Sequence, residues 1–556
     1  MRVQEAIAAS VHRLGVRHVF GLMGRGNMGF LLDMVHRHGI GYIGARHETN
    51  AVTMADAYAR STGRLGVATV SVGPAFSNAL TGILESARGQ TPLLLFAGDT
   101  ATTHGDYGQF LDQAPLLDAV GVAHRRLDEP HRVGPEIAEA ARRAVHDRRP
   151  VVLTVPLDVQ RKPVEALVEP VGPPEPAPHP LPDAAALDVA VEAIRRSRRP
   201  VLVAGRGALA PPARAALIEL AERAGAVLGT TLHADGLFAG EPWNVGLLGA
   251  HCTAYAADLM ATADLILAFG TGLDRYTTRG GHLFPQVREI VHCELDPRRA
   301  ASAPVTVRLT GDTTATARSL AAELRRGGHR ATGFRTGPWD PPPPSPASAT
   351  GTPAPGFVDL TELLSTLDAW LPAHRSVVQE SSHAAGNAVG HLRVAAPRAR
   401  VSTFDFESIG LGLATAVGTA VGRPDAPTVA AVGDGGALMA LGELETAVRH
   451  RLPILLLVLN DSAYGAEARE LEMRGLPITD ALFPTTDFAA VGRALGAAGT
   501  VVRDVSDLVA IRDWIARPEG PYVLDCRLDP TLVSGWFQLA IASPEGYLRR
   551  PRWQPC

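Results

Sequence analysis

The sequence is most informative at Val429-Ala430-Ala431-Val432-Gly433-Asp434-Gly435-Gly436. Four apolar residues of the kind that fill a buried strand lead directly into a glycine-rich turn with one acidic residue. Glycines let a backbone approach an anion closely, and amide groups at the start of a helix favour phosphate. The segment therefore predicts a strand, a turn and a helix of a parallel sheet, with ligand chemistry at the carboxyl end of the strand.

A second apolar run, Ile454 to Leu459, ends in Asn460-Asp461. Residues 436 to 459, 24 in all, separate Gly435 from Asn460. An Asp and an Asn at neighbouring strand ends can supply oxygen ligands to a Mg²⁺ ion that also holds diphosphate oxygens. The alternative is an ordinary strand-to-helix turn, because Gly-Asp-Gly alone is common.

Short apolar runs alternate with amphipathic helical stretches along the whole chain, as in Leu93 to Ala97 and Leu265 to Phe269. This alternation predicts an α/β protein whose sheets are mostly parallel and covered by helices on both faces. Two segments rich in Pro, Gly and Ala are predicted linkers. The chain is thereby divided into three doubly wound α/β domains, at 1–168, 183–330 and 357–556, with linkers at about 169–182 and 331–356.

Composition excludes several classes of function. The 556 residues carry 53 Lys+Arg against 57 Asp+Glu, and aromatic residues make up 5%, which gives no reason to expect nucleic acid or an anionic membrane as a partner. Lys162 is the one lysine, so a Walker-type phosphate loop is excluded. No apolar run reaches 18 residues, and the four cysteines show no CxxC spacing; we expect a cytoplasmic protein without a membrane span.

Two motifs in the first domain accompany the glycine-rich turn. Arg46-His47-Glu48 precedes an alanine-rich helical stretch at 51–61, and Gly73-Pro74-Ala75-Phe76-Ser77-Asn78 follows a strand. Together with Gly-Asp-Gly and Asn460, these motifs resemble those of the thiamine diphosphate (ThDP) enzymes. The resemblance is to the acetolactate synthase and benzoylformate decarboxylase branch, and it covers nearly the whole chain except the linkers and the last few residues.

The resemblance implies ThDP and Mg²⁺ as cofactors and a role for each domain. The first domain binds the aminopyrimidine ring, the central domain is Rossmann-like, and the third binds diphosphate and metal. Glu48 would hydrogen-bond the aminopyrimidine and promote its proton transfer, and Ile409 would support the bent cofactor from below. The implied metal ligands are Asp434, Asn460 and Ser462; the other implied cofactor contacts are Gly73, Asn78, Ser382, His383, Gly433, Gly435, Gly436 and Tyr464.

The resemblance also implies a homodimer or homotetramer, because in this family the site forms between the N-terminal domain of one subunit and the C-terminal domain of another. Arg25 stands where relatives carry other residues near the reacting carbon. There it would favour a substrate with an additional anionic group, unless it is an ordinary exposed arginine. Gln109 and His104 are further candidates for contact with the substrate.

We therefore expect an enzyme, similar to acetolactate synthase, that decarboxylates a 2-oxo acid or transfers the product to an aldehyde or ketone acceptor. The alternatives are an acetolactate synthase proper, a ThDP enzyme that cleaves a C–C bond without decarboxylation, and a catalytically silent homologue that binds ThDP. A nicotinamide oxidoreductase would rest only on Gly205-Arg206-Gly207. Some relatives hold FAD in the central domain, but Leu273 departs from their pattern and argues against FAD here.

Overall fold

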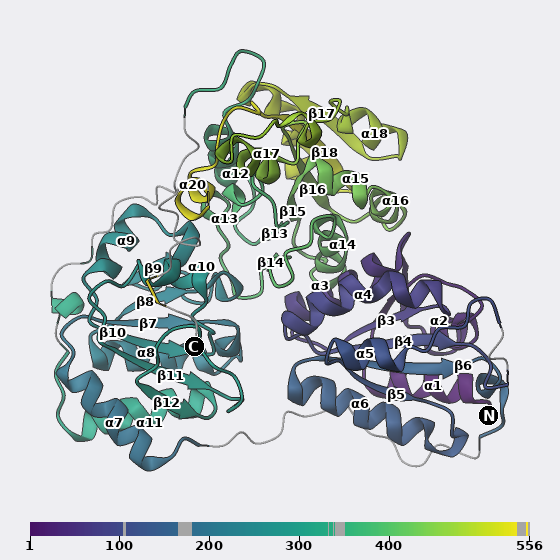
Figure 1. Ribbon diagram of the computed structural model, residues 1–556, viewed down its shortest axis with the longest axis horizontal. Helices are drawn as coiled ribbons and strands as arrows, with labels where there is room; N and C mark the ends of the chain where they lie inside the picture. The colour runs from purple at the N-terminus through teal and green to yellow at the C-terminus, as the bar shows by residue number, and fades with distance from the viewer. Residues whose placement is uncertain are drawn as a thin grey trace.

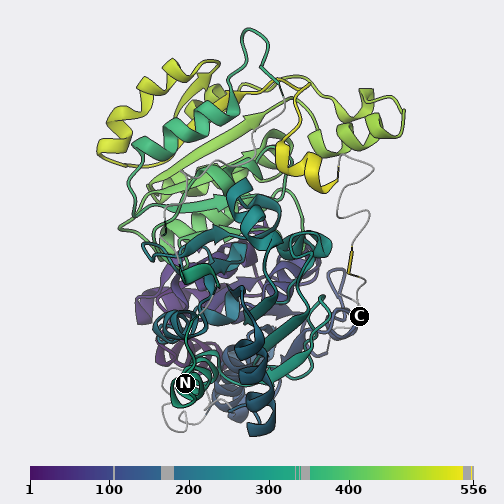
Figure 2. The same ribbon diagram turned by 90° about the vertical axis from the view of Figure 1, so that its left-hand side faces the viewer.

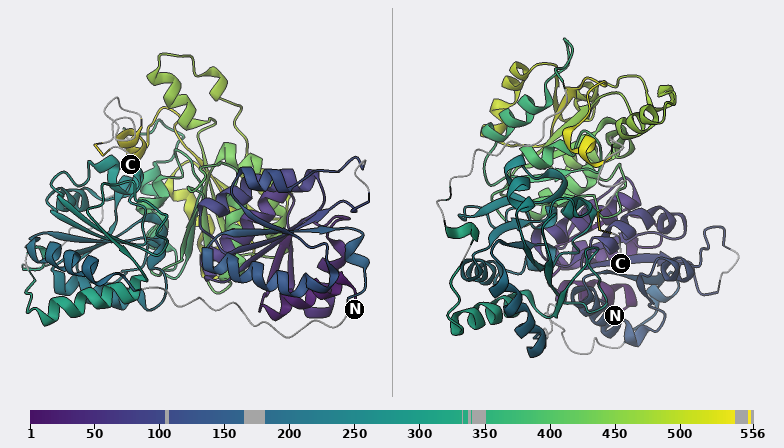
Figure 3. Two further views of the ribbon diagram at one scale, coloured as in Figure 1. Left: turned by 60° about the horizontal axis from the view of Figure 1, so that its bottom comes forward. Right: turned by 60° about the vertical axis from the view of Figure 1, so that its left-hand side comes forward.

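The computed structural model describes residues 1–103, 107–164, 181–331, 333–336, 339, 351–541 and 552–553. Three six-stranded sheets follow one another along this part of the chain, and every strand pairing within them is parallel. Each sheet is the centre of one domain, and the C-terminal domain contacts the other two (Figure 1). Helices lie on both sides of the N-terminal and central sheets (Figure 3). The predicted three-domain α/β fold is confirmed.

The N-terminal sheet has the strand order β2-β1-β3-β4-β6-β5. Its central strands are short, fully buried apolar runs, as a sheet covered on both faces requires. In chain order the elements are α1 (Val3–Arg13), β1 (His18–Gly21), α2 (Met28–His38), β2 (Gly41–Gly44), α3 (Glu48–Thr62), β3 (Gly66–Val70), α4 (Pro74–Arg88), β4 (Leu93–Asp99), α5 (Ala114–Ala119), β5 (Ala123–Arg126), α6 (Val133–Asp147) and β6 (Pro150–Pro156).

The central sheet has a different strand order, β12-β11-β10-β7-β8-β9. From β7, the chain first adds strands on one side, β8 and β9, and then adds β10, β11 and β12 on the other, so the strand order switches between β7 and β10. Such a switch point is where open α/β sheets place a crevice. The elements are α7 (Ala184–Arg196), β7 (Pro200–Ala204), α8 (Ala213–Ala224), β8 (Val227–Thr230), β9 (Asn244–Leu247), α9 (Ala254–Ala261), β10 (Leu265–Phe269), α10 (Arg275–Thr278), β11 (Glu289–Glu294), β12 (Val307–Thr310) and α11 (Thr313–Arg326).

The C-terminal sheet, β14-β13-β15-β16-β18-β17, repeats the strand order of the N-terminal sheet. Its elements are α12 (Leu360–Trp370), β13 (Ser376–Gln379), α13 (Asn387–His391), β14 (Arg400–Ser402), α14 (Gly412–Gly422), β15 (Thr428–Gly433), α15 (Asp434–Met439), α16 (Gly442–Arg449), β16 (Ile454–Asn460), α17 (Gly465–Met473), α18 (Phe488–Ala494), β17 (Ala498–Val502), α19 (Arg512–Ala516), β18 (Tyr522–Arg527) and α20 (Gly535–Ala540).

The N-terminal and C-terminal domains share one hydrophobic core, because α3 packs directly on α14 (Figures 1 and 2). Small residues make this close approach possible. A Cβ on Gly418 would lie 2.1 Å from the Met54 carbonyl oxygen, and one on Gly422 would lie 2.7 Å from Ser61 Oγ. The alanine-rich sequence of α3 and the glycines of α14 thus decide how these two domains dock.

Most of both predicted linkers lies outside the described residues. The second linker is predicted to bury no apolar surface, but two of its described residues do. Phe334 and Trp339 pack against the central domain, where the ring of Trp339 lies 4.8 Å from that of Trp243, centroid to centroid. Within the described ranges, every helix is too short or too polar to cross a membrane.

Candidate functional site

The glycine-rich turn lies where β15 ends and α15 begins. Gly433 is the last residue of β15, and Asp434 is the first of α15. In the parallel register Gly433 lies opposite Leu459, so the next residues, Asp434 and Asn460, leave the sheet next to each other. The fold therefore brings two of the candidate metal ligands together at the carboxyl edge of the sheet.

The carboxylate of Asp434 is buried and only half satisfied. Its side chain is 2% exposed, and Oδ1 accepts the N–H of Gly435 at 2.9 Å. Oδ2 has no hydrogen-bond partner among the described residues. Burial, reinforced by the Asp461 carboxylate, raises the pKa of Asp434 to about 7, and burial raises the pKa of Asp461 to about 6. A cation would stabilise this pair of carboxylates in their ionised form.

The side chain of Asn460 is held in one orientation. Its Nδ2 donates to the Thr486 carbonyl at 3.0 Å and to Asp525 Oδ1 at 2.8 Å. Its Oδ1 faces the hydroxyl of Ser462 at 3.4 Å. Ser462 has a φ of 56°, a left-handed conformation that costs a non-glycine residue free energy. An amide oxygen fixed by such surrounding bonds could hold a Mg²⁺ ion without reorganising.

Side chains pack closely against the glycines of the turn. A Cβ on Gly435 would lie 2.7 Å from the Tyr464 ring, and one on Gly436 would lie 2.0 Å from Glu380 Oε2. Glu380 is 1% exposed, and its Oε1 accepts two N–H groups of the segment 410–412, at 2.7 and 3.1 Å. Burial raises the pKa of Glu380 to about 7. This carboxyl group, which the sequence did not single out, connects the turn to the segment that carries Ile409.

A cavity of about 250 Å³ lies against the turn. Of the predicted cofactor contacts it is lined by Ser382, His383, Ile409, Gly433, Asp434, Gly435, Gly436 and Tyr464, whereas Asn460 and Ser462 are not among its lining residues. His383 Nε2 accepts the N–H of Ser534 at 3.0 Å, and its Nδ1 has no partner in the described ranges. Burial lowers the pKa of His383 to about 4, so the imidazole is neutral at pH 7.

The predicted residues of the N-terminal domain form a second group. Glu48 is the first residue of α3, and Asn78 Nδ2 donates to its Oε2 at 3.1 Å. Thr49 fixes the start of the same helix: its N–H donates to His47 Nδ1 at 3.2 Å, and its hydroxyl donates to the Asn78 carbonyl. Glu48 and Asn78 are thus in direct contact.

Gln109 lies between Gly73 and the surroundings of Arg25, because the Tyr107 hydroxyl donates to Gln109 Oε1 at 3.2 Å and Tyr107 lines the same cavity as Arg25. Gly73 has a φ of 50°, and a Cβ there would lie 2.1 Å from the Gln109 carbonyl oxygen. Arg25 is exposed and lines a cavity of about 280 Å³ together with Tyr107, Asp158 and other residues of the N-terminal domain. His104 lies outside the described residues.

Comparison with known proteins settles the family. The description "Thiamine pyrophosphate enzyme, N-terminal TPP binding domain" matches residues 1–120, the central domain of the same family matches 187–320, and its C-terminal TPP binding domain matches 384–526. The chain belongs to the thiamine pyrophosphate enzyme family. The predicted superfamily is confirmed, and thiamine pyrophosphate is another name for ThDP.

Relatives with several activities resemble this thiamine pyrophosphate enzyme. A sulfoacetaldehyde acetyltransferase of Alcaligenes xylosoxydans xylosoxydans is 27% identical, over 91% of this chain and 89% of the relative. The "Probable 2-ketoarginine decarboxylase AruI" of Pseudomonas aeruginosa is 30% identical, over 91% and 90%. An acetolactate synthase large subunit of Parasynechococcus marenigrum is 29% identical, over 90% and 83%. A solved structure described as a thiamin diphosphate-dependent enzyme of Mycobacterium smegmatis is 25% identical, with a TM-score of 0.79 over 96% of this chain and 100% of that one.

The cavity of this thiamine pyrophosphate enzyme is also lined by residues that sequence reasoning missed. Tyr276 comes from the central domain, and Trp536 and Phe537 come from α20. Tyr276 interacts with Glu407, which lines the same cavity. Asp274, next to Leu273, caps the helix that carries Tyr276 and was the one available signal; nothing in the sequence pointed to α20.

The two groups of predicted residues are separate within one chain. Across the described ranges, the lining of the 250 Å³ cavity comes from the central and C-terminal domains only. Glu48, Asn78 and Gln109 therefore lie in the chain's N-terminal half-site, defined here by these three residues and Gly73. Asp434, Asn460, His383 and Ile409 form the C-terminal half-site.

The Gly205–Gly207 turn has a packing role in the central domain. The N–H of Gly207 donates to the Gly270 carbonyl, and a Cβ on Gly205 would lie 2.4 Å from the same oxygen. Arg206, between them, pairs with Asp405 of the C-terminal domain at 2.9 Å. A second cavity, of about 590 Å³, lies at this switch point. The family match replaces the nicotinamide oxidoreductase alternative.

Proposed function

We propose that the chain binds ThDP with Mg²⁺ and decarboxylates a 2-oxo acid, releasing an aldehyde or transferring the product to an aldehyde or ketone acceptor. The observation that carries this proposal is Asp434, a buried carboxylate with an unpartnered oxygen beside Asn460 at the carboxyl edge of the sheet. When bound, ThDP would supply the electron sink that loss of a carboxylate from a 2-oxo acid requires.

Residues of the C-terminal half-site would hold the cofactor. Asp434 and Asn460, with Ser462, would bind Mg²⁺, and the glycines at 433, 435 and 436 would admit the diphosphate. Ile409, on the wall of the cavity, would support the cofactor, and Ser382 and neutral His383 would contact its diphosphate side. These residues would orient the cofactor and exclude water, and the cofactor would supply the chemistry that breaks the bond to the carboxylate.

Glu48 would exchange a proton with the aminopyrimidine ring, with Asn78 holding the carboxylate in place. Because Glu48 does not line the cavity beside Asp434, this arrangement favours a homodimer or homotetramer. The N-terminal half-site of one chain would then face the C-terminal half-site of another. Gln109 would contact the substrate, as the sequence predicts, and His104 remains a sequence prediction.

The 2-oxo acid could carry an additional anionic group or a cationic group, and one observation favours each. An exposed Arg25 would bind an additional anionic group, and one relative is named for sulfoacetaldehyde, which carries a sulfonate. Glu407 and Glu467 line the 250 Å³ cavity itself, and its described lining contains neither Lys nor Arg. Those carboxylates would favour a cationic group, and another relative is named for 2-ketoarginine.

A panel of 2-oxo acids tests the proposal. CO₂ release would be measured with ThDP and Mg²⁺ on pyruvate, 2-oxohexanoate, 2-oxoadipate and 2-oxo-5-guanidinovalerate. Preference for 2-oxoadipate that disappears in Arg25→Ala supports the anionic substrate, and preference for the guanidino acid that disappears in Glu407→Gln supports the cationic one. Pyruvate turnover with an acetolactate-type product would identify an acetolactate synthase proper. No CO₂ from any of them, with ThDP bound, would support the silent homologue.

A further inference from the structure

The contact between the N-terminal and C-terminal domains contains two buried glutamates in equivalent positions. Glu85 lies on α4, after the third strand of the N-terminal sheet, and is 1% exposed. Glu443 lies on α16, in the connection that follows the third strand of the C-terminal sheet, and is 0% exposed. Each reaches across the contact to backbone N–H groups of the other domain.

Glu443 holds the backbone immediately before Glu48. Its Oε1 accepts the N–H of Arg46 at 2.9 Å, the N–H of His47 at 3.2 Å and Nδ2 of Asn50 at 3.0 Å. Its other oxygen accepts the hydroxyl of a threonine on its own helix at 2.9 Å. Both carboxylate oxygens are thus used, and three of the four donors belong to the segment from which the Glu48 side chain emerges.

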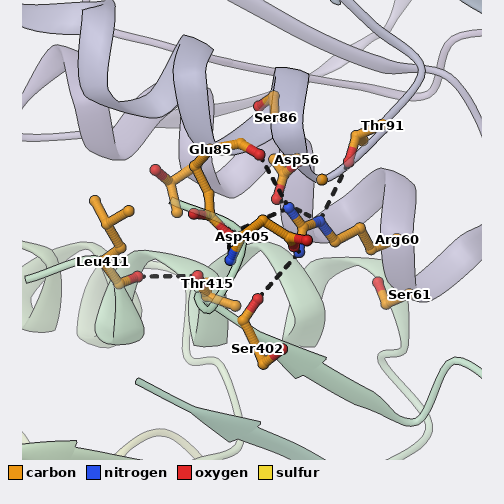
Figure 4. Close-up of polar contacts among 12 residues, drawn as sticks. Asp56, Arg60, Ser61, Glu85, Ser86, Thr91, Ser402, Asp405, Leu411 and Thr415 are labelled. Carbon is orange, nitrogen blue, oxygen red and sulfur yellow. Dashed lines mark hydrogen bonds and ion pairs between the residues drawn. The ribbon is translucent and has the colours of Figure 1, made fainter. Parts of the chain in front are cut away.

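Glu85 likewise holds the backbone of the segment before Ile409. Its Oε2 accepts the N–H of Phe406 at 2.7 Å, and its Oε1 lies 3.4 Å from the backbone nitrogen of Asp405. Arg60 of α3 completes the contact. It lies 3.3 Å from Glu85 Oε1 and donates to the Asp405 side chain at 2.7 Å (Figure 4). The held segment continues into Glu407, which has a left-handed φ of 61°, and then into Ile409.

The two contacts are related by the repeated strand order. Residues 46–47 follow the second strand of the N-terminal sheet, and residues 405–406 follow the second strand of the C-terminal sheet. The helices that begin after these segments, α3 and α14, pack on each other. Each domain therefore contributes one glutamate that binds a backbone segment of the other domain, and a pseudo-twofold axis relates the two contacts.

Packing alone does not account for this pattern. Burying a carboxylate is unfavourable unless it is fully hydrogen-bonded, and an apolar side chain would fill the same space at lower cost. Carboxylate bonds to backbone N–H groups are charge-assisted, so they fix a segment more firmly than a neutral contact. Both segments that are fixed in this way lead directly into a residue of a half-site.

We propose that Glu443 and Glu85 are reciprocal positioning residues: Glu443 of the C-terminal domain sets the place of Glu48, and Glu85 of the N-terminal domain sets the place of Ile409. This inference rests on the proposed function, because it takes Glu48 and Ile409 as contacts of ThDP. Neither glutamate touches the cofactor cavity, and each acts through the backbone it holds. The N-terminal domain is thereby coupled to the cofactor pocket within its own chain.

Hydrogen exchange measured by mass spectrometry tests the proposal on the full-length protein. Glu443→Gln should speed exchange at residues 46–47, Glu443→Ala should speed it more, and both should leave 405–406 protected. The corresponding Glu85 variants should speed exchange at 405–406 and leave 46–47 protected. Each weakened bond should speed exchange about fivefold. Glu445→Gln is the matched control, because Glu445 lies on the same helix and pairs with the Arg46 side chain at 2.7 Å without touching its backbone.

Two further measurements separate positioning from a structural role. Glu443→Gln should lower kcat with an unchanged Kd for ThDP, whereas Glu85→Gln should raise the Kd for ThDP measured in Mg²⁺ by calorimetry. Should either alanine variant fail to fold, the glutamine variant carries the test. Equal loosening of both segments, or selective loosening with kcat and Kd unchanged, would overturn the proposal. If the wild-type protein binds no ThDP, the proposed function is refuted, and so is the positioning role of the two glutamates.

Discussion

The N-terminal and C-terminal domains share one strand order but prepare their half-sites differently. In the N-terminal half-site, the Glu48 carboxylate already has a partner in Asn78. In the C-terminal half-site and the adjoining Glu380, one polar atom of each buried side chain has no partner among the described residues: Asp434 Oδ2, Glu380 Oε2 and His383 Nδ1. Burying these atoms without a partner costs free energy that a bound cofactor would offset. In the proposed function, the N-terminal half-site supplies the carboxylate that acts on that cofactor.

This difference separates binding from chemistry. Loss of a C-terminal group should chiefly weaken cofactor binding, and loss of the N-terminal carboxylate should chiefly slow turnover. The central domain, whose sheet has another strand order, adds Tyr276 to the wall of the cavity and holds Asp405 through Arg206. The substitutions below test this division, beginning with the largest expected effect.

Glu48→Gln should lower turnover of the best 2-oxo acid by about 10²- to 10⁴-fold, because a positioned proton-transfer group is worth that much. The amide keeps the shape and the contact with Asn78, so the Kd for ThDP should change by less than about threefold. Steady-state CO₂ release and calorimetry measure the two quantities. Glu129→Gln, an exposed substitution in the same domain, is the control. Unchanged turnover would revive the silent homologue.

Asp434→Asn should weaken ThDP binding in Mg²⁺ by about 100-fold or more, since loss of a direct ligand exceeds the 10- to 100-fold cost of losing an outer partner. Removing Mg²⁺ with a chelator should weaken wild-type binding and have little further effect on the variant. Asp480→Asn, exposed in the same domain, is the control. A variant that still responds to Mg²⁺ like the wild type would show that the metal lies elsewhere.

Glu380→Gln should flatten the pH dependence of stability of the cofactor-free protein. The pKa of Glu380 is about 7 in the folded chain against an ordinary value of 4.5, so the folded state keeps a proton that the unfolded state loses. The free energy of unfolding should therefore fall as the pH rises from 5 to 8, by about 2 kcal/mol from this group. Urea unfolding at several pH values measures it. An identical slope in wild type and variant would contradict the assignment.

Glu445→Gln should have the smallest effect. Its ion pair with Arg46 lies at the surface, with side chains 31% and 52% exposed, and such pairs contribute less than about 1 kcal/mol. The melting temperature and turnover should both stay close to wild type. A large loss of turnover would mean that the N-terminal half-site is positioned through side chains rather than through the backbone that Glu443 holds.

The local part of this architecture could be predicted from the sequence. Apolar runs located β10 and β16, and the Gly-Asp-Gly turn with Asn460 located the C-terminal half-site, because strand ends of a parallel sheet meet at one edge. The long-range part could not. Glu443 and Arg46 are 397 positions apart in sequence, and no local pattern indicates which buried glutamate reaches which backbone. The same holds for Tyr276, which reaches the cavity from the central domain, and for Trp536, which α20 brings back to it from late in the chain.

Complementation between two inactive variants tests most directly that one site needs both half-sites from different chains. Glu48→Gln and Asp434→Asn would be co-expressed with different affinity tags, and CO₂ release would be measured on the mixture. If the half-sites of a site come from two chains, a mixed dimer contains one intact site, and random assortment should restore about a quarter of wild-type activity. The account predicts this recovery. If both half-sites of a site came from the same chain, every site would keep one of the two substitutions, and the absence of any recovery would contradict the account.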